Sequence, residues 1–339
     1  MYSEIERLTL ALCTPHGTPG CEEEVFKVAE KELSFCSEVT SDPLSGVTGI
    51  LGNPNAKRRI LLDAHIDQIG MCVTNIDDEG FLHLTQVGGI DRRTMPGSTV
   101  TVFGKETLTG IICTLPPHLS HGDGKVDPVD KQAVDLGMTK EEVEKLVSVG
   151  DRVVLTNPVK KLLNNRVSGT ALDDRSGCAC IIRAAQLVKD QSPDCCVMVV
   201  CSTREEVGGQ GARIRAYTLE PTEAIAVDVS FATQPGTSGL TAELGGGPMI
   251  GFSSALDRKM SKKLIRLAKE QNIPYQLEAM GGRTGTNADC IGISRGGVRT
   301  GLISIPQRNM HTPAEVCDLE DMENIAKLIA AYIMDNQEA

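Results

Sequence analysis

The sequence contains no tryptophan, and aromatic residues account for only 3% of its 339 residues. Its interior must therefore be filled largely by valine, isoleucine, leucine, alanine and methionine, within a hydrophobic content of 40%. Chains of this length fold as one large domain or as two domains of ordinary size, with a sizeable core. We expect a globular protein with an aliphatic core.

An excess of basic residues is also absent. The 45 acidic residues outnumber the 34 basic ones, which gives a formal net charge of -11. This balance argues against nucleic acids and anionic membranes as main partners, because both require basic surface patches. No segment reaches the roughly 18 consecutive apolar residues of a membrane span, and the first residues lack the basic and apolar regions of a signal peptide. We therefore expect a cytoplasmic protein.

The twelve cysteines include no C-x-x-C pair. A disulfide framework is typical of short secreted chains, which this is not. Most of the cysteines lie inside apolar runs and are expected to be small core residues. The closest spacings, Cys178-x-Cys180 and Cys195-Cys196, have no partner pair, so a cysteine-based zinc site is disfavoured.

Apolar runs alternate with helical segments on both sides of a central block. This alternation predicts an α/β fold, with a mostly parallel sheet and helices on both faces. The expected helices are 21–35, 176–189, 261–271 and 319–334, and the expected strands are 60–64, 197–201, 224–229 and 300–305.

The central block, from Met71 to Asn164, has a different pattern. Short alternating runs such as FLHLTQV, STVTVFG and DRVVLTN are separated by glycine, proline and aspartate, which predicts a small antiparallel sheet or barrel. Residues 1–70 and 165–339 are thus expected to form the α/β domain, and 71–164 an inserted β-rich domain. The inserted histidines are expected to have surface or structural roles: His83, His118 and His121.

Acidic and imidazole side chains follow the carboxyl ends of several predicted strands or precede a helix. Ligand sites of open α/β sheets lie beyond these strand ends. We therefore expect one cluster made of the following residues: His65, Asp67, Asp173, Asp174, Glu205, Glu206, Asp228 and His311.

Carboxylates gathered in this way would repel one another without a positive counter-charge. Two histidines with several acids suit zinc, cobalt or manganese. Two such ions about 3.5–4 Å apart, sharing a carboxylate, form a known hydrolytic arrangement in which a bridging water attacks a carbonyl. A neighbouring carboxylate that binds no metal then transfers the proton.

Simpler interpretations exist for single motifs. Asp173 and Asp174 are also a favourable pair at the N-terminus of a helix. Glu205 and Glu206 could lie in a solvated turn before two glycines. Asp228 is harder to explain in this way, because it follows the apolar run AIAV and would be costly to bury unpaired.

Five motifs in order, HIDQIG, ALDDRSG, EEVGGQGA, VDVSFATQPG and SIPQRNMHTPAEV, resemble the M42 family of metallo-aminopeptidases over nearly the whole chain. The resemblance implies hydrolysis of the N-terminal peptide bond of peptides with a free N-terminus, by attack of a metal-bridging water. It also implies homo-oligomers, typically a dodecamer built from dimers, with subunit contacts made by the inserted domain.

The same resemblance implies roles for individual residues. Asp173 would bridge two divalent metal ions, Glu205 would be the general base, and Asp67 would support His65 and fix its tautomer. The implied metal ligands are His65, Asp173, Glu206, Asp228 and His311.

Two positions depart from the family pattern. Gln68 stands where the family commonly has glutamate, and Asn287 where many relatives have aspartate. We expect these differences to bear on specificity rather than on metal ligation. Two alternatives stay open: a metal-dependent deacylase or carboxypeptidase-like amidohydrolase, and a non-catalytic oligomeric binding protein.

Overall fold

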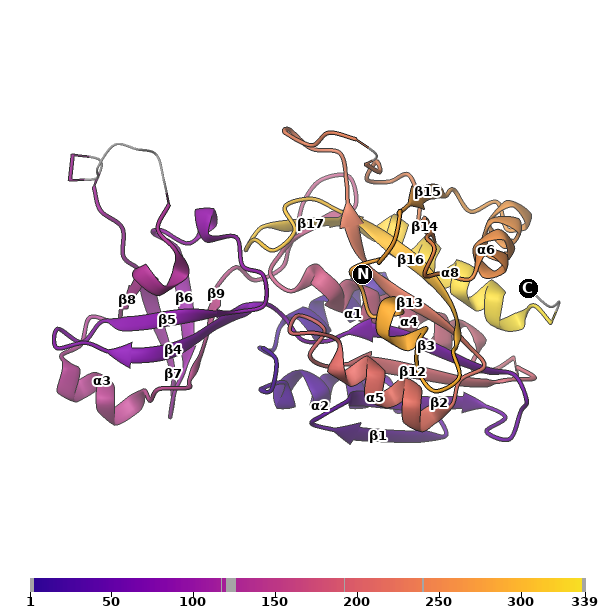
Figure 1. Ribbon diagram of the computed structural model, residues 1–339, viewed down its shortest axis with the longest axis horizontal. Coiled ribbons are helices and arrows are strands. Elements are labelled where there is room, and N and C mark those ends of the chain that lie inside the picture. The colour runs from indigo at the N-terminus through magenta and orange to yellow at the C-terminus, as the bar shows by residue number, and fades with distance from the viewer. Residues whose placement is uncertain (1–2, 117, 120–125, 192, 240, 337–339) are drawn as a thin grey trace.

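The computed structural model describes residues 3–116, 118–119, 126–191, 193–239 and 241–336 (Figure 1). Its larger part contains an eight-stranded sheet in the order β1-β2-β12-β3-β13-β16-β14-β15. These strands are β1 (Glu38–Asp42), β2 (Gly46–Gly52), β12 (Cys196–Ser202), β3 (Arg59–His65), β13 (Glu223–Phe231), β16 (Arg299–Gln307), β14 (Met249–Phe252) and β15 (Gln276–Ala279).

The four central strands, β12, β3, β13 and β16, run parallel to one another. The flanking strands β2 and β14 run antiparallel to the central strands beside them. The expected strands 60–64, 197–201, 224–229 and 300–305 all lie within these four. The parallel arrangement brings four carboxyl ends to the same edge of the sheet.

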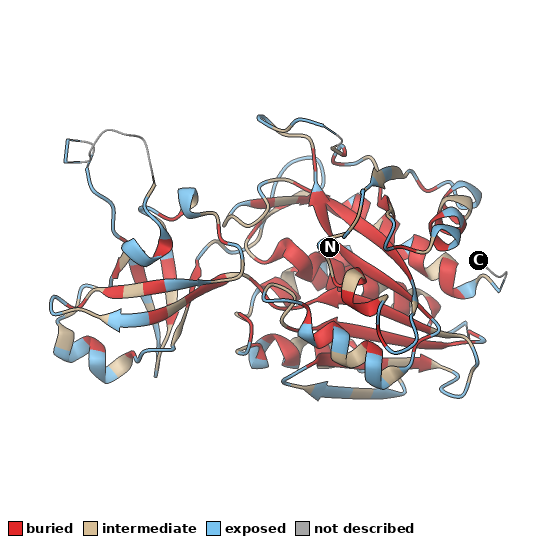
Figure 2. Cartoon of the chain, in the orientation of Figure 1, coloured by how far each residue is buried: buried red, intermediate tan, exposed pale blue. Residues whose placement is uncertain are grey.

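Helices cover both faces of this sheet (Figure 1). Alternate residues of β3 show how the two faces are buried: Ile60 and Leu62 belong to the main hydrophobic cluster, while Leu61 packs in a second cluster with Ala212 and Ala216. The helices are α1 (Glu4–Cys13), α2 (Glu23–Glu32), α4 (Leu172–Val188), α5 (Gln210–Leu219), α6 (Arg258–Glu270), α7 (Ala288–Ile291) and α8 (Leu319–Met334). The predicted α/β fold is confirmed, and the sheet is buried on both faces (Figure 2).

The central block forms a closed barrel of strands β4-β5-β8-β7-β6-β9, on the left in Figure 1. Its own hydrophobic cluster is aliphatic and includes Met71, Val100 and Val153. The barrel part consists of β4 (Gly70–Ile76), β5 (Leu82–Val87), η1 (Arg92–Thr94), β6 (Thr99–Phe103), β7 (Thr107–Ile112), η2 (Val129–Lys131), β8 (Ala133–Asp135), α3 (Lys140–Leu146) and β9 (Arg152–Leu155).

The two parts are joined by chain segments and by side-chain contacts. A small sheet of β10 (Lys160–Lys161), β11 (Arg166–Gly169) and β17 (Glu315–Asp318) follows the barrel. His16 stacks on Phe103 at the end of β6, with ring centroids 3.6 Å apart and planes inclined by 12°. His16, which the sequence left without a role, therefore packs between the two parts.

The histidines of the barrel part and the closely spaced cysteines lie where the sequence placed them, as far as the structure describes them. His83 pairs with Asp77 at 3.0 Å and His118 is exposed, in agreement with surface or structural roles, whereas His121 lies outside the described residues. The four cysteines that lie close together in the sequence are free thiols and are buried, as expected of core residues: Cys178, Cys180, Cys195 and Cys196. In the part of the chain that the structure describes, no helix has the length and apolar character to cross a membrane.

Candidate metal centre

A cavity of about 600 Å³ opens at the carboxyl ends of the central strands. His65 ends β3 beside Ser202 of β12, and Asp228 lies on β13 beside Ser304 of β16. Because these strands are parallel neighbours, the residues that follow them project toward the same space. The cavity is lined by all the expected ligands and by Glu205.

The first candidate metal group consists of His65, Asp173 and Asp228. His65 Nε2 lies 3.1 Å from Asp173 Oδ1 and 3.9 Å from Asp228 Oδ1. One donor atom from each residue lies within 4.8 Å of the others, and all three residues are buried. One cation can therefore be held by an imidazole and two carboxylates.

The second candidate group consists of Asp173, Glu206 and His311. His311 Nε2 lies 3.3 Å from Asp173 Oδ2 and 3.6 Å from Glu206 Oε1. Asp173 belongs to both groups and presents a different oxygen to each imidazole. The five residues expected as ligands are thus brought together, with Asp173 between the two groups.

Asp173 is positioned by the start of α4. The helix is assigned from Leu172, but Asp173 and Asp174 have non-helical backbone angles and are joined by a cis peptide bond. Asp174 Oδ1 accepts the backbone N–H of Gly177 at 3.1 Å. Asp174 therefore caps the helix, as the simpler interpretation predicted, while the carboxylate of Asp173 is left to face the imidazoles.

Asp67 supports the site in two ways. Its backbone carbonyl lies 3.0 Å from His65 Nδ1, so Nδ1–H can donate to it and Nε2 is left facing Asp173. Its carboxylate accepts the backbone N–H groups of Glu205 and Glu206, at 3.1 and 3.2 Å. The shorter contact with Nδ1 is therefore made by the main chain, while Asp67 Oδ1 lies 3.6 Å from the same nitrogen and also accepts the N–H of Glu205.

Glu205 and Glu206 do not lie in a solvated turn. Both line the cavity, and the side chain of Glu206 is only 5% exposed. Burial raises the pKa of the Glu205 carboxyl. Burial and the charge of Asp173 raise the pKa of Glu206 to about 8.

The charges of the cluster are not balanced by the two histidines. The hydrogen bond that His311 donates to Asp173 raises the pKa of His311 to about 9 against the effect of burial. Burial opposes the ionisation of Asp173, but hydrogen bonds from His311 and His65 lower its pKa nevertheless. Burial also raises the pKa of Asp228 well above its usual range. Carboxylates in surplus over cations, with imidazole nitrogens among them, fit the ligand preferences of zinc, cobalt and manganese.

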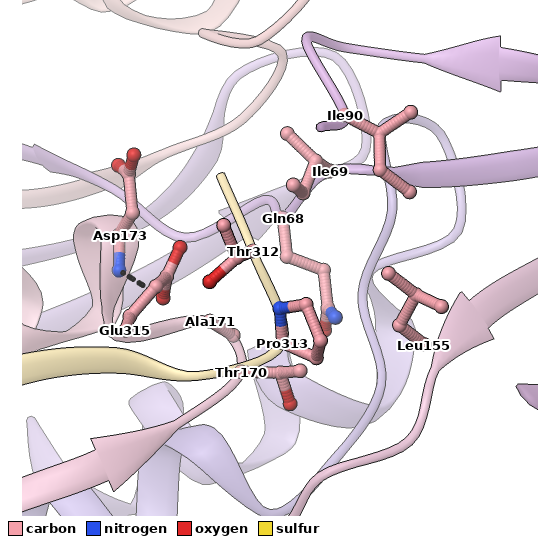
Figure 3. A pocket seen from close by; sticks show the side chains of 10 residues that line it. All are labelled: Gln68, Ile69, Ile90, Leu155, Thr170, Ala171, Asp173, Thr312, Pro313 and Glu315. Carbon is pink, nitrogen blue, oxygen red and sulfur yellow. Dashed lines mark hydrogen bonds between the residues drawn. The ribbon is translucent and has the colours of Figure 1, made fainter. Parts of the chain in front are cut away.

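The sequence did not single out Glu315, which lies four residues after His311 in the motif HTPAEV. Its carboxylate is buried and accepts the backbone N–H groups of Leu172 at 2.9 Å, Asp173 at 3.2 Å and His311 at 3.3 Å. Figure 3 shows the bond to Asp173 at the wall of a small cavity also lined by Ile69. One carboxylate thus holds the backbone of two candidate ligands.

Gln68 and Asn287, the two residues that depart from the family pattern, are buried and bind other residues of the protein by hydrogen bonds. Gln68 Oε1 accepts a hydrogen bond from Arg175 Nη2 at 2.8 Å, and the fully buried Arg175 otherwise binds backbone carbonyls. Asn287 is buried and donates to Asp63 at 2.8 Å and to Ser202 at 3.0 Å. Neither Gln68 nor Asn287 is among the residues that line the large cavity.

Residues 46–328 match the family model of the M42 glutamyl aminopeptidases. The chain is 33% identical to the lysyl aminopeptidase of Pyrococcus furiosus, over 87% of this chain and 86% of the relative. It shares 31% identity and a TM-score of 0.92 with a TET aminopeptidase from a marine sediment thaumarchaeote, covering 98% of this chain and 96% of the other.

A second solved structure is the Pyrococcus horikoshii TET1 peptidase, which can assemble into a tetrahedron or a large octahedral shell. It is 32% identical, with a TM-score of 0.86, and the match covers 98% of this chain and all of the other. The resemblance seen in the motifs is confirmed by these matches and extends over both parts of the fold. The chain belongs to the M42 family of aminopeptidases and is a peptide-bond hydrolase.

Proposed function

We propose that the protein is a dinuclear metal-dependent aminopeptidase that removes the N-terminal residue of peptides. The observation that carries the proposal is the position of Asp173, whose two carboxylate oxygens face His65 and His311 at 3.1 and 3.3 Å. Asp228 completes the first group and Glu206 the second. Two divalent ions, zinc, cobalt or manganese, would fit this donor set.

The bound ions would polarise the scissile carbonyl and make a water molecule more acidic. Glu205 is the proposed general base, because it lines the cavity but belongs to neither candidate metal group. Its raised pKa suits a group that takes a proton from the attacking water and delivers it to the leaving amine. Asp67 holds the backbone of Glu205 and so fixes the reach of that base.

We also propose that the chain forms homo-oligomers such as a dodecamer built from dimers, with residues 71–164 as an inserted contact domain. Exposed apolar side chains in and beside the barrel support this: Leu115, Leu119, Val149 and Leu163 are each at least 60% exposed. Burying these apolar side chains against a second copy of the chain would remove them from water and so favour association.

A panel of amino-acid anilides tests the proposed activity, using protein loaded with zinc, cobalt or manganese and protein treated with a chelator. We expect release only from anilides with a free amine, abolished by the chelator. Release from an N-acetylated anilide alone would support the deacylase alternative instead. Absence of release with every metal, together with absence of bound metal in the purified protein, would favour a non-catalytic binding protein.

A further inference from the structure

Strands β14 and β15 lie at one edge of the sheet (Figure 1), and residues of both line the cavity of the metal centre. Glu278 on β15 lines this region. Its Oε2 accepts the hydroxyl of Ser304 at 2.7 Å, and its Oε1 accepts the hydroxyl of Ser230. Two hydroxyl donors from two other strands therefore hold this carboxylate in place.

Glu278 lies close to the candidate metal centre. Ser304 on β16 is the register partner of Asp228 on β13, and neighbouring strands are about 4.8 Å apart. Ser230 follows Asp228 by two residues, so both side chains project from the same face of β13. The hydroxyls that bind Glu278 thus come from positions beside and just after a candidate ligand.

No cation of the protein neutralises Glu278 in the described part of the chain. No ion pair joins it to a lysine or arginine there, and none of the residues that line the cavity is a lysine or arginine. The other acids of the cavity, Asp173, Glu205, Glu206 and Asp228, gather at the candidate metal centre. Of these four, Asp173, Glu206 and Asp228 belong to the candidate metal groups and Glu205 is the proposed base, so Glu278 is the acid of the cavity that is left without a role.

The wall around Glu278 is otherwise largely apolar. It includes Phe231, Met249, Leu277 and Met280. Such a wall can pack the methylene stem of a long side chain while a cationic end group reaches an acid. An ionised carboxylate has about four acceptor positions, so the two serine hydroxyls leave others free for a ligand.

We propose that Glu278 selects peptides whose N-terminal residue is lysine or arginine. This inference rests on the proposed aminopeptidase activity and adds the substrate class. The ammonium or guanidinium of the first residue would donate charge-assisted hydrogen bonds to Glu278, with its stem against Met249 and Met280. An acidic first residue would be repelled, and a neutral one would gain no such bond.

The sharpest test compares the lysine anilide with the norleucine anilide, because the two side chains have similar length and differ in the terminal ammonium. For the metal-loaded wild type we expect kcat/KM to be roughly ten- to hundredfold higher for lysine. Glu278→Gln should bring the ratio close to one, because the loss of kcat/KM should fall far more on the lysine anilide than on the norleucine anilide. Glu278→Asp, which keeps the charge, should retain part of the preference.

Glu144→Gln is the matched control, since it removes the same charge from an exposed position on α3. It should leave the ratio at the wild-type value. Equal turnover of both anilides by the wild type would overturn the inference and leave the proposed activity standing. An equal loss on both anilides in Glu278→Gln would also overturn it, because that pattern indicates recognition of the α-amine or a structural role. Failure to cleave any free-amine anilide would overturn the proposed function and this inference with it.

Discussion

The carboxylate of Asp67 accepts the backbone N–H of Glu205, with 3.1 Å between oxygen and nitrogen. Its second oxygen accepts the N–H of Glu206 at 3.2 Å. Asp67 is fully buried, and its main-chain carbonyl also faces the imidazole of His65. One residue therefore links a candidate ligand, the proposed base and the loop that carries it.

Asp67→Asn should impair catalysis more than metal binding. An amide offers one acceptor oxygen and one NH₂ donor, so one of the two loop N–H groups would lose its acceptor. We expect kcat to fall about ten- to hundredfold, as is typical when support behind a metal ligand is lost. Steady-state kinetics and metal analysis of the same preparation check this. Asp78→Asn, at an exposed position, is the control, and an unchanged kcat in Asp67→Asn would contradict the role of the loop.

Glu205→Gln and His65→Ala should separate proton transfer from metal binding. The amide side chain of Glu205→Gln is nearly isosteric but cannot take a proton, so kcat should drop roughly a hundred- to ten-thousandfold while metal content is kept. His65→Ala removes a nitrogen donor of the first group and should lose metal at that position. Calorimetric titration with zinc reports both variants. Full activity in Glu205→Gln would refute the assignment of the base.

Glu315→Gln should weaken metal binding although Glu315 is not itself a member of either candidate metal group. Its carboxylate accepts three backbone N–H groups, from Leu172, Asp173 and His311. A glutamine would turn an NH₂ group toward one of them and displace a ligand-bearing segment. We expect metal affinity to fall about ten- to hundredfold. Competition with a chromogenic chelator measures this, and Glu320→Gln, on the exposed side of α8, is the control.

The contact of His16 with Phe103, between the two parts of the fold, should make the stability of the protein sensitive to acid. Burial lowers its pKa from 6.5 to about 4, and its Nδ1 has no hydrogen-bond partner among the described residues. The unfolded chain therefore binds the proton first as the pH falls. The contribution of neutral His16 to stability is present above pH 6.5 and is lost progressively as the pH falls toward the folded pKa.

Between pH 7 and pH 5 this effect should lower the free energy of unfolding by about 1–2 kcal/mol. His16→Phe would keep a ring against Phe103 but would not titrate, so it should lose less stability over that range. Urea unfolding at both pH values measures the difference. His118→Phe, at an exposed position, serves as the control, and identical pH dependence in His16→Phe and wild type would rule out this account of His16.

Several strands could be located from the sequence because they are buried on both faces. Every residue of β12 is buried, and an uninterrupted apolar run of this length is typical of a strand covered on both sides. The edge strands β1 and β15 were not predicted, since all their residues are exposed or intermediate and show no clear apolar pattern. Central strands can therefore be predicted from local sequence more readily than edge strands.

By itself, the sequence determined the aliphatic core, the α/β alternation, the barrel-like block and the polar residues at strand ends, because each depends on neighbouring positions in the chain. Only the tertiary structure decided which polar atoms meet. Asp173 and Glu315 are 142 positions apart, and Ser230 and Glu278 are 48 apart. Their contacts depend on how strands are ordered and how loops return to the sheet edge. For the same reason, the structure alone showed that the main-chain carbonyl of Asp67 makes the shorter contact with His65 and that its carboxylate also holds the loop of Glu205.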